Sequence, residues 1–506
     1  MALFNSIASW LMVKRMHQID LFRKYPHDVQ AEWFSKLMES GKETEFGKLH
    51  GMQDIKTVDQ FRERVPIHEY DNLKPWIERL RRGEQHLLWP TEVKWFAKSS
   101  GTTGDKSKFI PVTEESLYDC HYKGGKDMVS IYCNCYPEHQ LFTGKNLALG
   151  GSHKTDFFDD YESYHGDVSA IIIQNLPLWA ELLRAPQIQI ALMSEWEEKL
   201  ELMARSTMKE NVTSLAGVPS WMLVLLRRIL DISGKKTIQE VWPNLEVYYH
   251  GGVSLSPYKQ QFREVIGHDL NLLELYNASE GFFGIQDEKD GDLLLMLDYG
   301  IVYEFLPPGE WNKPDGKSLL LPEVELGVQY ALIISTTGGL WRYDVGDTIE
   351  FTCLSPYRFR ITGRTKHFIN VFGEEVMIGN AEKALQTACE KTGAVVGEYT
   401  VAPLFMDSNG KQGAHEWLIE FATPPDDEAY FAELLDNALK ALNSDYEAKR
   451  YRNFILQLPV LRSLPQGSFY NWLKANNKLG GQYKVPRLAN NRKIADSLLS
   501  LAQRAL

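Results

Sequence analysis

The sequence predicts an α/β protein with a large N-terminal domain of β-sheets flanked by helices and a smaller α+β C-terminal domain. Three observations support this expectation. The chain has 506 residues, which suits one large and one small domain better than a single domain. Stretches with helical spacing dominate up to Leu230, and short strand-like runs follow them. After Gly363, strand and helix patterns alternate over about 140 residues, as in a compact domain.

The helices expected in the first part are identified by spacing and by end signals. Residues 65–80 enter a helix after a proline turn, and residues 194–208 have helical spacing. Residues 219–234 carry Pro219 near the start and Gly234 just beyond the end, which are typical helix termini.

The strands expected in the first domain are short apolar runs, rich in β-branched and aromatic residues and punctuated by Gly, Pro and Asp. They lie at residues 245–252, 270–277, 293–307, 330–339 and 348–354.

The C-terminal part alternates between strand and helix patterns. Strands are expected at residues 367–376, 415–422 and 453–461, and helices at residues 378–393, 427–450 and 467–480. We therefore expect one domain over residues 1–365 and a second over residues 366–506.

Net charge and cysteine content exclude several kinds of partner. The formal net charge is −12, and a strongly acidic protein binds polyanions poorly, so we expect neither nucleic acid nor membrane as a partner. Five cysteines are too few and too scattered for a disulfide framework and fit a reducing compartment. Cys133 and Cys135 lack a second pair at zinc spacing, so we interpret them as ordinary buried thiols.

The first residues of the chain do not have the pattern of a targeting or membrane-spanning segment. Their apolar run is short, and basic residues follow it rather than precede it. The apolar positions suit an amphipathic helix: Leu3, Ile7, Leu11, Ile19 and Leu21. We expect a soluble, cytoplasmic protein; its oligomeric state is open, and a monomer is compatible with the sequence.

Residues 98–113, KSSGTTGDKSKFIPVT, combine hydroxyls, glycines and lysines in one short loop. The loop lacks the Walker spacing, because Lys106 stands five residues after Gly101 where a second glycine would be required. Glycines nevertheless permit close backbone approach, and successive N–H groups can hold an anion. By itself this composition fits a phosphate-binding loop and a polar surface turn equally well.

Two later stretches have related chemistry. In LYNASEGFFG, residues 275–284, a tyrosine that can stack on a base is followed by a hydroxyl and by Glu280, a possible Mg²⁺ ligand. In WRYDVGD, residues 341–347, an acidic residue at a glycine turn suits a ribose diol. Taken singly, Tyr276 as a core residue and Asp347 as a turn cap are the simpler interpretations.

In this order, these stretches and ITGRTK at residues 361–366 resemble the adenylate-forming superfamily. The resemblance is closest to the acyl acid amido synthetases, the auxin-responsive plant enzymes that conjugate hormones to amino acids, and their bacterial relatives. VPIHEYDNLKPWIERL, GLWRYDVGD, ALNSDYEAKR and GGQYKVPRL are similar to that family's motifs and extend the resemblance over nearly the whole chain. It implies the adenylate-forming fold, with sheets and a barrel in the large domain and a mobile C-terminal lid.

The resemblance also implies an ATP site. The loop expected to hold the β- and γ-phosphates comprises Ser99, Ser100, Gly101, Thr102, Thr103 and Gly104. Gly252, Val253 and Tyr276 would lie at the adenine, and the run continues through Asn277 and Ala278 to Ser279 at the α-phosphate.

The remaining implied roles concern metal, ribose and catalysis. Glu280 would coordinate Mg²⁺, and Asp347 would hold the ribose hydroxyls. Arg364 would lie beside the nucleotide at the hinge, and Lys484 would reach the phosphates and the acyl carboxylate during adenylation. A surface position for Lys484 is the simpler alternative.

The chain departs from the plant pattern in places. Asp344 stands where plant enzymes often carry arginine, and GEEV at residues 373–376 replaces an Asp–Lys pair. This puts one nucleotide-side lysine in doubt. The HGGV stretch at residues 250–253 also differs from the plant adenine segment, and residues 116–230 match too loosely to indicate an acyl substrate.

The function implied is ATP- and Mg²⁺-dependent adenylation of a carboxylic acid, followed by transfer to an amine, which we expect to be an amino acid. An acyl-CoA ligase with the same acyl-adenylate intermediate is the alternative, and a nucleotide-binding scaffold without turnover is a second. Any of His68, His121, His153 and His165 is a possible base for the amine, but each fits a structural role better, so none is assigned.

Overall fold

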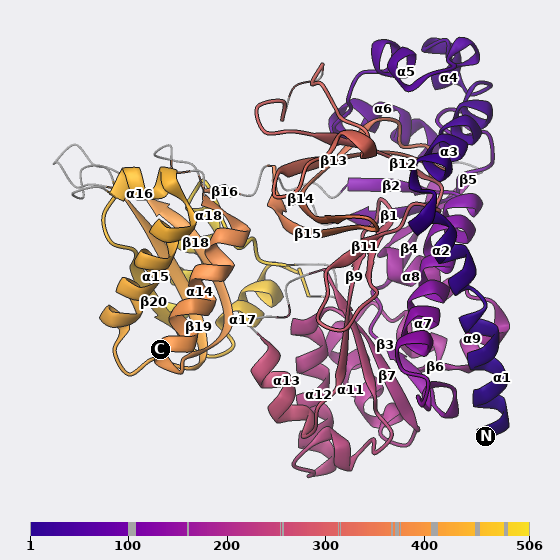
Figure 1. The fold of residues 1–506 in the computed structure, drawn as a ribbon. Helices are drawn as coiled ribbons and strands as arrows, with labels where there is room; N and C mark the ends of the chain where they lie inside the picture. Colours follow the sequence, from indigo (N-terminus) through magenta and orange to yellow (C-terminus); the bar gives the residue numbers. More distant parts are fainter. Residues whose placement is uncertain are drawn as a thin grey trace. The chain divides into compact units, whose positions relative to one another are not determined.

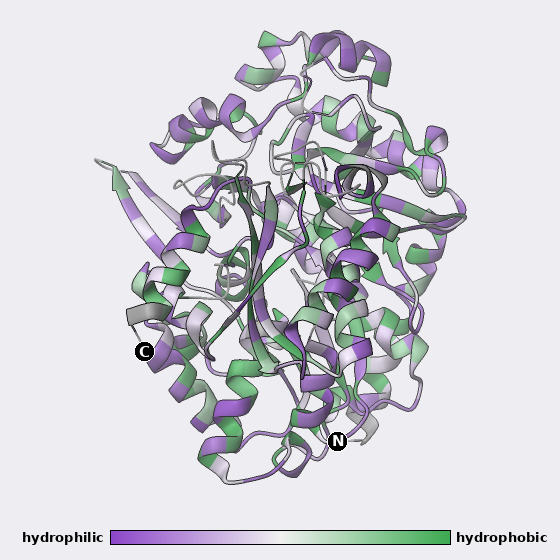
Figure 2. Ribbon diagram, turned by 90° about the vertical axis from the view of Figure 1, so that its left-hand side faces the viewer, coloured by the Kyte–Doolittle hydropathy of each residue, from purple (hydrophilic) through white to green (hydrophobic). Residues whose placement is uncertain are grey.

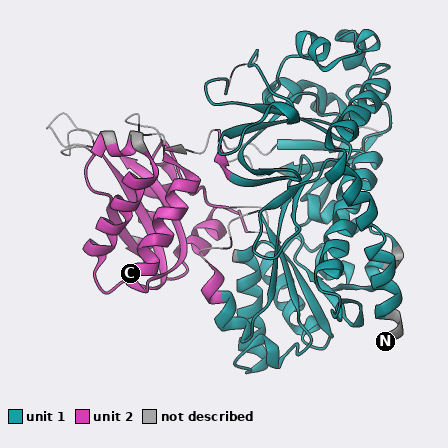
Figure 3. Ribbon diagram, in the orientation of Figure 1, with its two compact units in different colours: residues 1–253, 262–361, 480–482 teal, residues 254–261, 362–479, 483–506 magenta. Residues whose placement is uncertain are grey.

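The computed structural model describes residues 2–99, 108–158, 161–252, 255, 258–311, 313, 315–365, 368–369, 374, 376–405, 413–450, 456–479 and 484–504. The chain divides into two compact units (Figure 3). The first unit comprises Met1–Val253, Phe262–Ile361 and Gly480–Gln482, and the second comprises Ser254–Gln261, Thr362–Leu479 and Tyr483–Leu506. Residues 254–261 thus belong with the second unit, although they precede most of it by a hundred residues; the expected domain limit after residue 365 stays a prediction.

Helices make up the start of the first unit: α1 (Ala2–Val13), α2 (Met16–Lys24), α3 (Pro26–Gly41), α4 (Glu45–Leu49), η1 (Met52–Asp54), α5 (Val58–Arg64) and α6 (Tyr70–Arg81). The expected N-terminal helix is therefore two helices, separated by a turn at Lys14 and Arg15. Ile19 is fully buried, whereas Ile7 and Leu11 are half exposed, so only part of the apolar pattern reaches the core.

A mixed sheet forms the centre of the first unit (Figure 1). Its order in the described residues is β12–β13–β14–β15–β11–β10–β9–β8–β7–β3–β6. The strands β6, β3, β7, β8 and β9 are parallel, and the strands from β9 to β11 and from β12 to β14 pair antiparallel. Bounds of these strands are β3 (Lys145–Ala148), β6 (Arg184–Ala185), β7 (Val212–Gly217), β8 (Val247–Gly251), β9 (Asn271–Asn277), β10 (Phe282–Gln286), β11 (Leu293–Leu295), β12 (Ile301–Leu306), β13 (Gln329–Thr336), β14 (Tyr343–Leu354) and β15 (Tyr357–Arg364).

The parallel strands are joined by helical connections, as parallel pairing requires. These are α8 (Val168–Gln174), α9 (Leu178–Leu182), α10 (Ile188–Ala191), α11 (Trp196–Thr207), α12 (Pro219–Ser233), η4 (Ile238–Glu240) and α13 (Lys259–Ile266). Gly234 ends α12 in the left-handed conformation that the sequence pattern predicted. The described helices carry hydrophilic and hydrophobic segments in turn (Figure 2), as expected when one face packs on a sheet.

A second sheet in the first unit has the order β2–β1–β5–β4. Its strands are β1 (Trp95–Ser99), β2 (Lys108–Val112), β4 (His153–Phe158) and β5 (Tyr161–Gly166). The π-helix η2 (Ser116–Tyr122) follows β2 directly and continues into α7 (Lys123–Cys135), with the short helices η3 (Leu141–Thr143) and η6 (Leu321–Glu323) elsewhere in the unit.

Burial explains the strand types. Every residue of β12 is buried, so its sequence is a continuous apolar run rather than an alternation. The expected strand at residues 293–307 is two strands, β11 and β12, because the positive φ of Gly300 allows a turn between them.

The second unit is an α+β structure. Its sheets are β18–β19–β20 and β16–β17, built from β16 (Phe368–Ile369), β17 (Val376–Met377), β18 (Val395–Leu404), β19 (Ala414–Thr423) and β20 (Val460–Leu464). Its helices are α14 (Ile378–Thr392), α15 (Glu428–Leu442), α16 (Ser444–Arg450), α17 (Ser468–Ala475) and α18 (Lys493–Arg504). Leu385, Trp417 and Phe431 lie in its separate core. The predicted α/β class with an α+β C-terminal part is confirmed.

Two predictions in this unit are wrong in detail. The helix expected over residues 427–450 breaks at Asn443, whose backbone is extended at φ −146° and ψ 110°. The Asn443 side chain accepts a hydrogen bond from the Tyr446 backbone N–H at 2.7 Å, so it caps the start of α16. The strand expected at residues 453–461 begins only at Val460, in the part of that range that the structure describes.

All five cysteines lie in the part of the chain that the structure describes, and all are free. Cys133 is buried. Cys135, the last residue of α7, is exposed, contrary to the prediction. None of the helices described here combines the length and the apolar character needed to cross a membrane.

Candidate active site

The hydroxyl- and glycine-rich loop connects two paired strands. β1 and β2 are antiparallel, and their last pair is Ser99 opposite Lys108. The predicted phosphate residues Ser100, Gly101, Thr102, Thr103 and Gly104 lie outside the described residues, as does Lys106. A loop closed by a two-stranded ladder keeps both its ends fixed, which a phosphate-holding loop requires.

Lys108 is the described lysine of this stretch. Its Nζ lies 3.5 Å from the Tyr343 hydroxyl and 5.8 Å from the centre of the Tyr70 ring. The Tyr70 hydroxyl in turn accepts a hydrogen bond from the Phe109 backbone N–H at 2.9 Å. Two aromatic side chains thus place the Lys108 ammonium at the base of the loop.

The stretch LYNASEGFFG forms a hairpin between β9 and β10. The Ala278 N–H donates to the Gly281 carbonyl at 2.8 Å, and the Gly281 N–H donates back at 3.3 Å, which closes a four-residue turn. Ser279 and Glu280 occupy the tip of this turn, and Ser279 is only 9% exposed. A Cβ at Gly281 would lie 2.9 Å from the end of the Ile301 side chain, so a larger residue here would have to displace that side chain.

Asp347 projects from a bulge in β14. Ile333 pairs with Asp344 and Ala331 pairs with Thr348, so the three residues 345–347 stand opposite Leu332 alone. Gly346 makes this possible with a φ of 81°, and its N–H donates to the Asp344 carboxylate at 2.8 Å. The glycine turn in the sequence is therefore a bulge, which takes Asp347 out of the Cα register with β13.

The hairpin and the bulge meet. The Tyr276 hydroxyl donates a short hydrogen bond to Asp347 Oδ2, although the two residues are 71 positions apart. The Tyr276 ring is 6% exposed and lies edge-on to Phe283 at 4.8 Å between centroids. Tyr276 is thus a core residue that orients the proposed ribose ligand, and its contact with adenine stays a prediction.

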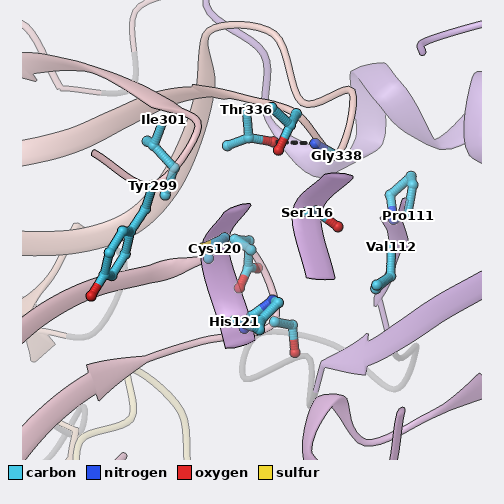
Figure 4. Close-up of a pocket in the computed structure, with 13 residues that line it drawn as sticks. Pro111, Val112, Ser116, Cys120, His121, Tyr299, Ile301, Thr336 and Gly338 are labelled. Atoms are coloured by element: carbon cyan, nitrogen blue, oxygen red, sulfur yellow. Dashed lines mark hydrogen bonds between the residues drawn. The ribbon is translucent and has the colours of Figure 1, made fainter. Parts of the chain in front are cut away.

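A pocket lies beside the Ser279–Glu280 turn (Figure 4). Its walls come from the end of β2, the π-helix, the hairpin turn, the start of β12 and the end of β13. The lining residues are Pro111, Val112, Ser116, Cys120, His121, Ser279, Glu280, Gly281, Tyr299, Ile301, Thr336, Thr337 and Gly338. The two hairpin residues predicted to hold α-phosphate and metal therefore share a recess with the segment that follows the loop.

The π-helix determines which side chains face this pocket. Ser116, Cys120 and His121 all line the pocket, because residues four and five apart lie on the same side of a π-helix. His121 is 6% exposed, and burial lowers the pKa of its imidazole to about 4, so the ring is neutral near pH 7. His121 is not assigned from the sequence, where a structural role fits it better. The π-helical register that brings it to the pocket wall cannot be recognised in the sequence.

The other predicted residues lie as follows. Gly252 follows β8 with a φ of 78°, and Val253 lies outside the described residues. Arg364 is the last residue of β15 and belongs to the second unit. Lys484 also belongs to the second unit, and the backbone just after it is fixed, because the Val401 N–H donates to the Arg487 carbonyl at 2.8 Å.

Metal ligands are sparse in the described part of the chain, where no group of three or more His, Cys, Asp or Glu side chains could hold an ion. Glu280, which the sequence predicts as a Mg²⁺ ligand, lines the pocket.

His68 supports β14 from the side and provides a test of stability. Its N–H donates to the Arg342 carbonyl and its own carbonyl accepts from the Asp344 N–H, both at 2.9 Å. Burial lowers the pKa of the His68 imidazole to about 4. The folded protein therefore binds this proton only at a pH well below the pH at which the unfolded chain binds it.

Stability is therefore expected to fall as the pH drops from 6.5 towards 4. Between pH 7 and pH 5, His68 alone should remove about 2 kcal/mol from the free energy of unfolding. Urea unfolding of the parent and of His68→Gln at both pH values measures this. The free energy of unfolding of the variant should fall by about 2 kcal/mol less than that of the parent. Parallel losses in the two proteins would contradict the assignment.

Comparisons with known proteins place these features in a family. Residues 15–272 match the GH3 family N-terminal domain, residues 294–364 the GH3 family central domain, and residues 379–493 the GH3 family C-terminal domain. The indole-3-acetic acid-amido synthetase GH3.3 of Arabidopsis thaliana is 22% identical over 96% of this chain and 93% of its own length. The 4-substituted benzoates-glutamate ligase GH3.12 of the same plant is 24% identical over 86% and 88%.

Solved structures share the fold. The acyl acid amido synthetase AtGH3.15, in complex with 2,4-DB, matches with a TM-score of 0.81 at 17% identity, over 98% of this chain and 96% of that one. The 2-hydroxyisobutyryl-CoA ligase in the postadenylation state, in complex with 2-HIB-AMP, matches with a TM-score of 0.60 at 12% identity, over 94% and 91%. At these identities the likeness establishes the fold.

Proposed function

The chain belongs to the GH3 family, and from this we propose that it is an acyl acid amido synthetase. The reaction has two steps. A carboxylate oxygen attacks the α-phosphorus of ATP and pyrophosphate leaves, which gives an acyl-adenylate. An amine nitrogen then attacks the acyl carbon, the carbon–oxygen bond breaks with its electrons going to AMP, and the nitrogen loses a proton to give the amide.

The observation that supports this proposal most directly is the meeting of Tyr276 and Asp347 next to the turn that carries Ser279 and Glu280. A hydroxyl, a carboxylate for a metal and a carboxylate for a diol are the groups that a Mg·ATP site needs. Ser279 and Glu280 lie at a hairpin tip, and Asp347 lies in the segment of β14 that bulges opposite Leu332 of β13.

We assign the nucleotide roles from this arrangement and from the family. Asp347, oriented by Tyr276, holds the ribose hydroxyls, and Ser279 contacts the α-phosphate. The loop after Ser99 holds the β- and γ-phosphates through its N–H groups and hydroxyls, and Gly252 lies near the adenine. Arg364 lies at the hinge side of the nucleotide.

Mg²⁺ enters as the Mg·ATP complex, so the protein needs only a partial ligand set. Glu280 would provide the carboxylate ligand. When bound, the ion lowers the cost of bringing the substrate carboxylate close to the anionic phosphates. Lys484 supplies a second positive charge as a point donor to phosphate and carboxylate.

The free state of all five cysteines fits a reducing compartment, which supports our proposal of a cytoplasmic enzyme. The substrates are a small carboxylic acid and an amine, for which we propose an amino acid because the relatives GH3.3 and GH3.12 are named as an amido synthetase and a glutamate ligase.

The proposal is tested with purified protein, Mg·ATP and a panel of carboxylic acids. We expect acid-dependent ATP–pyrophosphate exchange with at least one acid. We then expect AMP release and an amide, detected by mass spectrometry, when the twenty amino acids are added with that acid.

A parallel reaction with CoA in place of the amino acids distinguishes an amido synthetase from an acyl-CoA ligase. AMP release that requires CoA and yields a thioester would make the chain an acyl-CoA ligase. Binding of ATP without exchange for any acid would leave only a nucleotide-binding protein.

A further inference from the structure

The Arg487 side chain lies three residues after Lys484 and is only 11% exposed. Its Nη1 donates to Glu398 Oε2 at 2.7 Å and to the Tyr399 carbonyl at 3.1 Å, and its Nη2 donates to the Tyr258 hydroxyl at 2.7 Å. The guanidinium also lies over the Tyr399 ring, 4.6 Å from its centre. Because a guanidinium is planar and its donors are fixed, these partners hold it in one orientation.

Tyr258 reaches this cluster from a part of the chain far from the other members. It belongs to residues 254–261, which lie with the second unit (Figure 3). Its hydroxyl donates a short hydrogen bond to Glu398 Oε1 while it accepts from Arg487, so the three side chains form a closed ring of hydrogen bonds. The Tyr258 side chain is 2% exposed, and shielding from water strengthens such bonds.

Two residues separate Lys484 from this cluster, and both are constrained. Pro486 has a fixed φ, and the residue before a proline, here Val485, is confined to an extended backbone. Val485 is 6% exposed, and the Pro486 carbonyl accepts from Thr400 Oγ1 at 2.6 Å. The backbone at Lys484 therefore follows the position of Arg487.

A lysine that delivers charge to a reacting centre depends on such support. Its side chain is a flexible four-carbon stem, so the ammonium returns to one place only if the backbone below it is held. Displacement of a catalytic group by about 1 Å can reduce a rate by about a hundredfold. The groups that hold Arg487 therefore affect the rate of any step in which Lys484 takes part.

We propose that Tyr258 and Glu398 are positioning residues for adenylation. Through Arg487 they hold the backbone from which Lys484 reaches the phosphates and the acyl carboxylate. This inference rests on the proposed function, in which Lys484 supplies a positive charge to the first step. Neither positioning residue needs to touch a substrate.

A double-mutant cycle with Lys484→Ala tests this inference. Tyr258→Phe removes only the hydroxyl, and Glu398→Gln keeps the size of the side chain and removes its charge. With Lys484 present, we expect acid-dependent ATP–pyrophosphate exchange to slow about fivefold in Tyr258→Phe and about twentyfold in Glu398→Gln. In the Lys484→Ala background, each should slow the remaining exchange by less than about twofold, because no lysine is left to position.

Nucleotide affinity provides a second measurement. The affinity for Mg·ATP without acid should stay within about threefold of the parent value in both variants, since Lys484 acts on charge that develops during the attack. The loss should therefore be seen in the maximal exchange rate and not in the ATP concentration for half-maximal exchange.

Tyr446→Phe is the matched control. Tyr446 is another buried tyrosine of the second unit, and its hydroxyl donates to Asp436 Oδ1 at 2.8 Å. Arg450 Nη2 donates to Asp436 Oδ2 at 3.0 Å, so this cluster also joins a tyrosine, an acid and an arginine. The control loses the same hydroxyl from the same kind of cluster and should leave exchange unchanged in both backgrounds. Thermal unfolding of every variant measures stability separately from exchange.

The outcomes distinguish this inference from the function on which it rests. Absence of acid-dependent exchange in the parent would overturn the proposed function and this inference with it. Exchange in the parent, with parent-like rates in Tyr258→Phe and Glu398→Gln, would overturn the inference alone. Equal fold losses with and without Lys484 would also overturn it, because the cluster would then act independently of the lysine. A loss in Tyr446→Phe as large as that in Tyr258→Phe would do the same, since weakening the second unit anywhere would then suffice.

Discussion

Replacing Lys484 by alanine is expected to slow acid-dependent ATP–pyrophosphate exchange by about two to three orders of magnitude. The affinity for Mg·ATP without acid should change by less than about threefold, because the lysine acts on charge that develops during the attack. Exchange rates and nucleotide titration on the same preparation measure the two effects separately.

Two further variants sharpen this result. Lys484→Arg keeps the charge but presents a planar fork in place of a compact ammonium, so it should restore only part of the rate. Lys493→Ala removes an exposed lysine at the start of α18 in the same unit and should behave like the parent. Equal loss of binding and exchange in Lys484→Ala would show that the residue supports the structure or the nucleotide in its ground state.

Glu280→Gln is expected to reduce exchange by about two orders of magnitude at saturating ATP and acid. The substitution keeps the size of the side chain and removes the negative charge proposed for Mg²⁺. The Mg²⁺ concentration for half-maximal exchange should rise together with the loss of rate, and a magnesium titration at fixed ATP measures it.

Glu288→Gln is the matched control for this charge. Glu288 is an exposed glutamate shortly after β10, paired with Arg358 at 2.5 Å, and it does not line the pocket. It should leave the magnesium dependence unchanged. If Glu280→Gln keeps the parent's magnesium dependence, Glu280 is not a metal ligand and its role is to support the hairpin turn.

The sequence predicts elements with strong local signals. The ends of α12 follow from Pro219 and Gly234, and the start of α6 follows from the proline turn before it. It fails where one residue overrides a periodic pattern. Asn443 interrupts an amphipathic run of 24 residues, since its side chain caps the next helix, and periodicity alone does not reveal this.

The candidate site is predicted as a set of residues and not as a geometry. Tyr276 and Asp347 are recognised by motif, but their contact depends on a bulge that only the pairing of β13 with β14 reveals. His121 carries no motif at all. Its place in the pocket depends on a π-helix, a conformation that depends on tertiary context rather than on a propensity of the residues themselves.

The bulge in β14 has a consequence for how the strand tolerates changes in length. Three residues against one amount to two extra residues, an even number, so side chains before and after the bulge keep the same inward and outward alternation. Loss of a single residue there would turn Ile349 and Phe351, both fully buried, towards the opposite face. Loss of a pair would leave the ladder in phase and remove only the projection that carries Asp347. At this position, therefore, a deletion of two residues should remove the site but keep the fold, whereas a deletion of one residue should disrupt the fold.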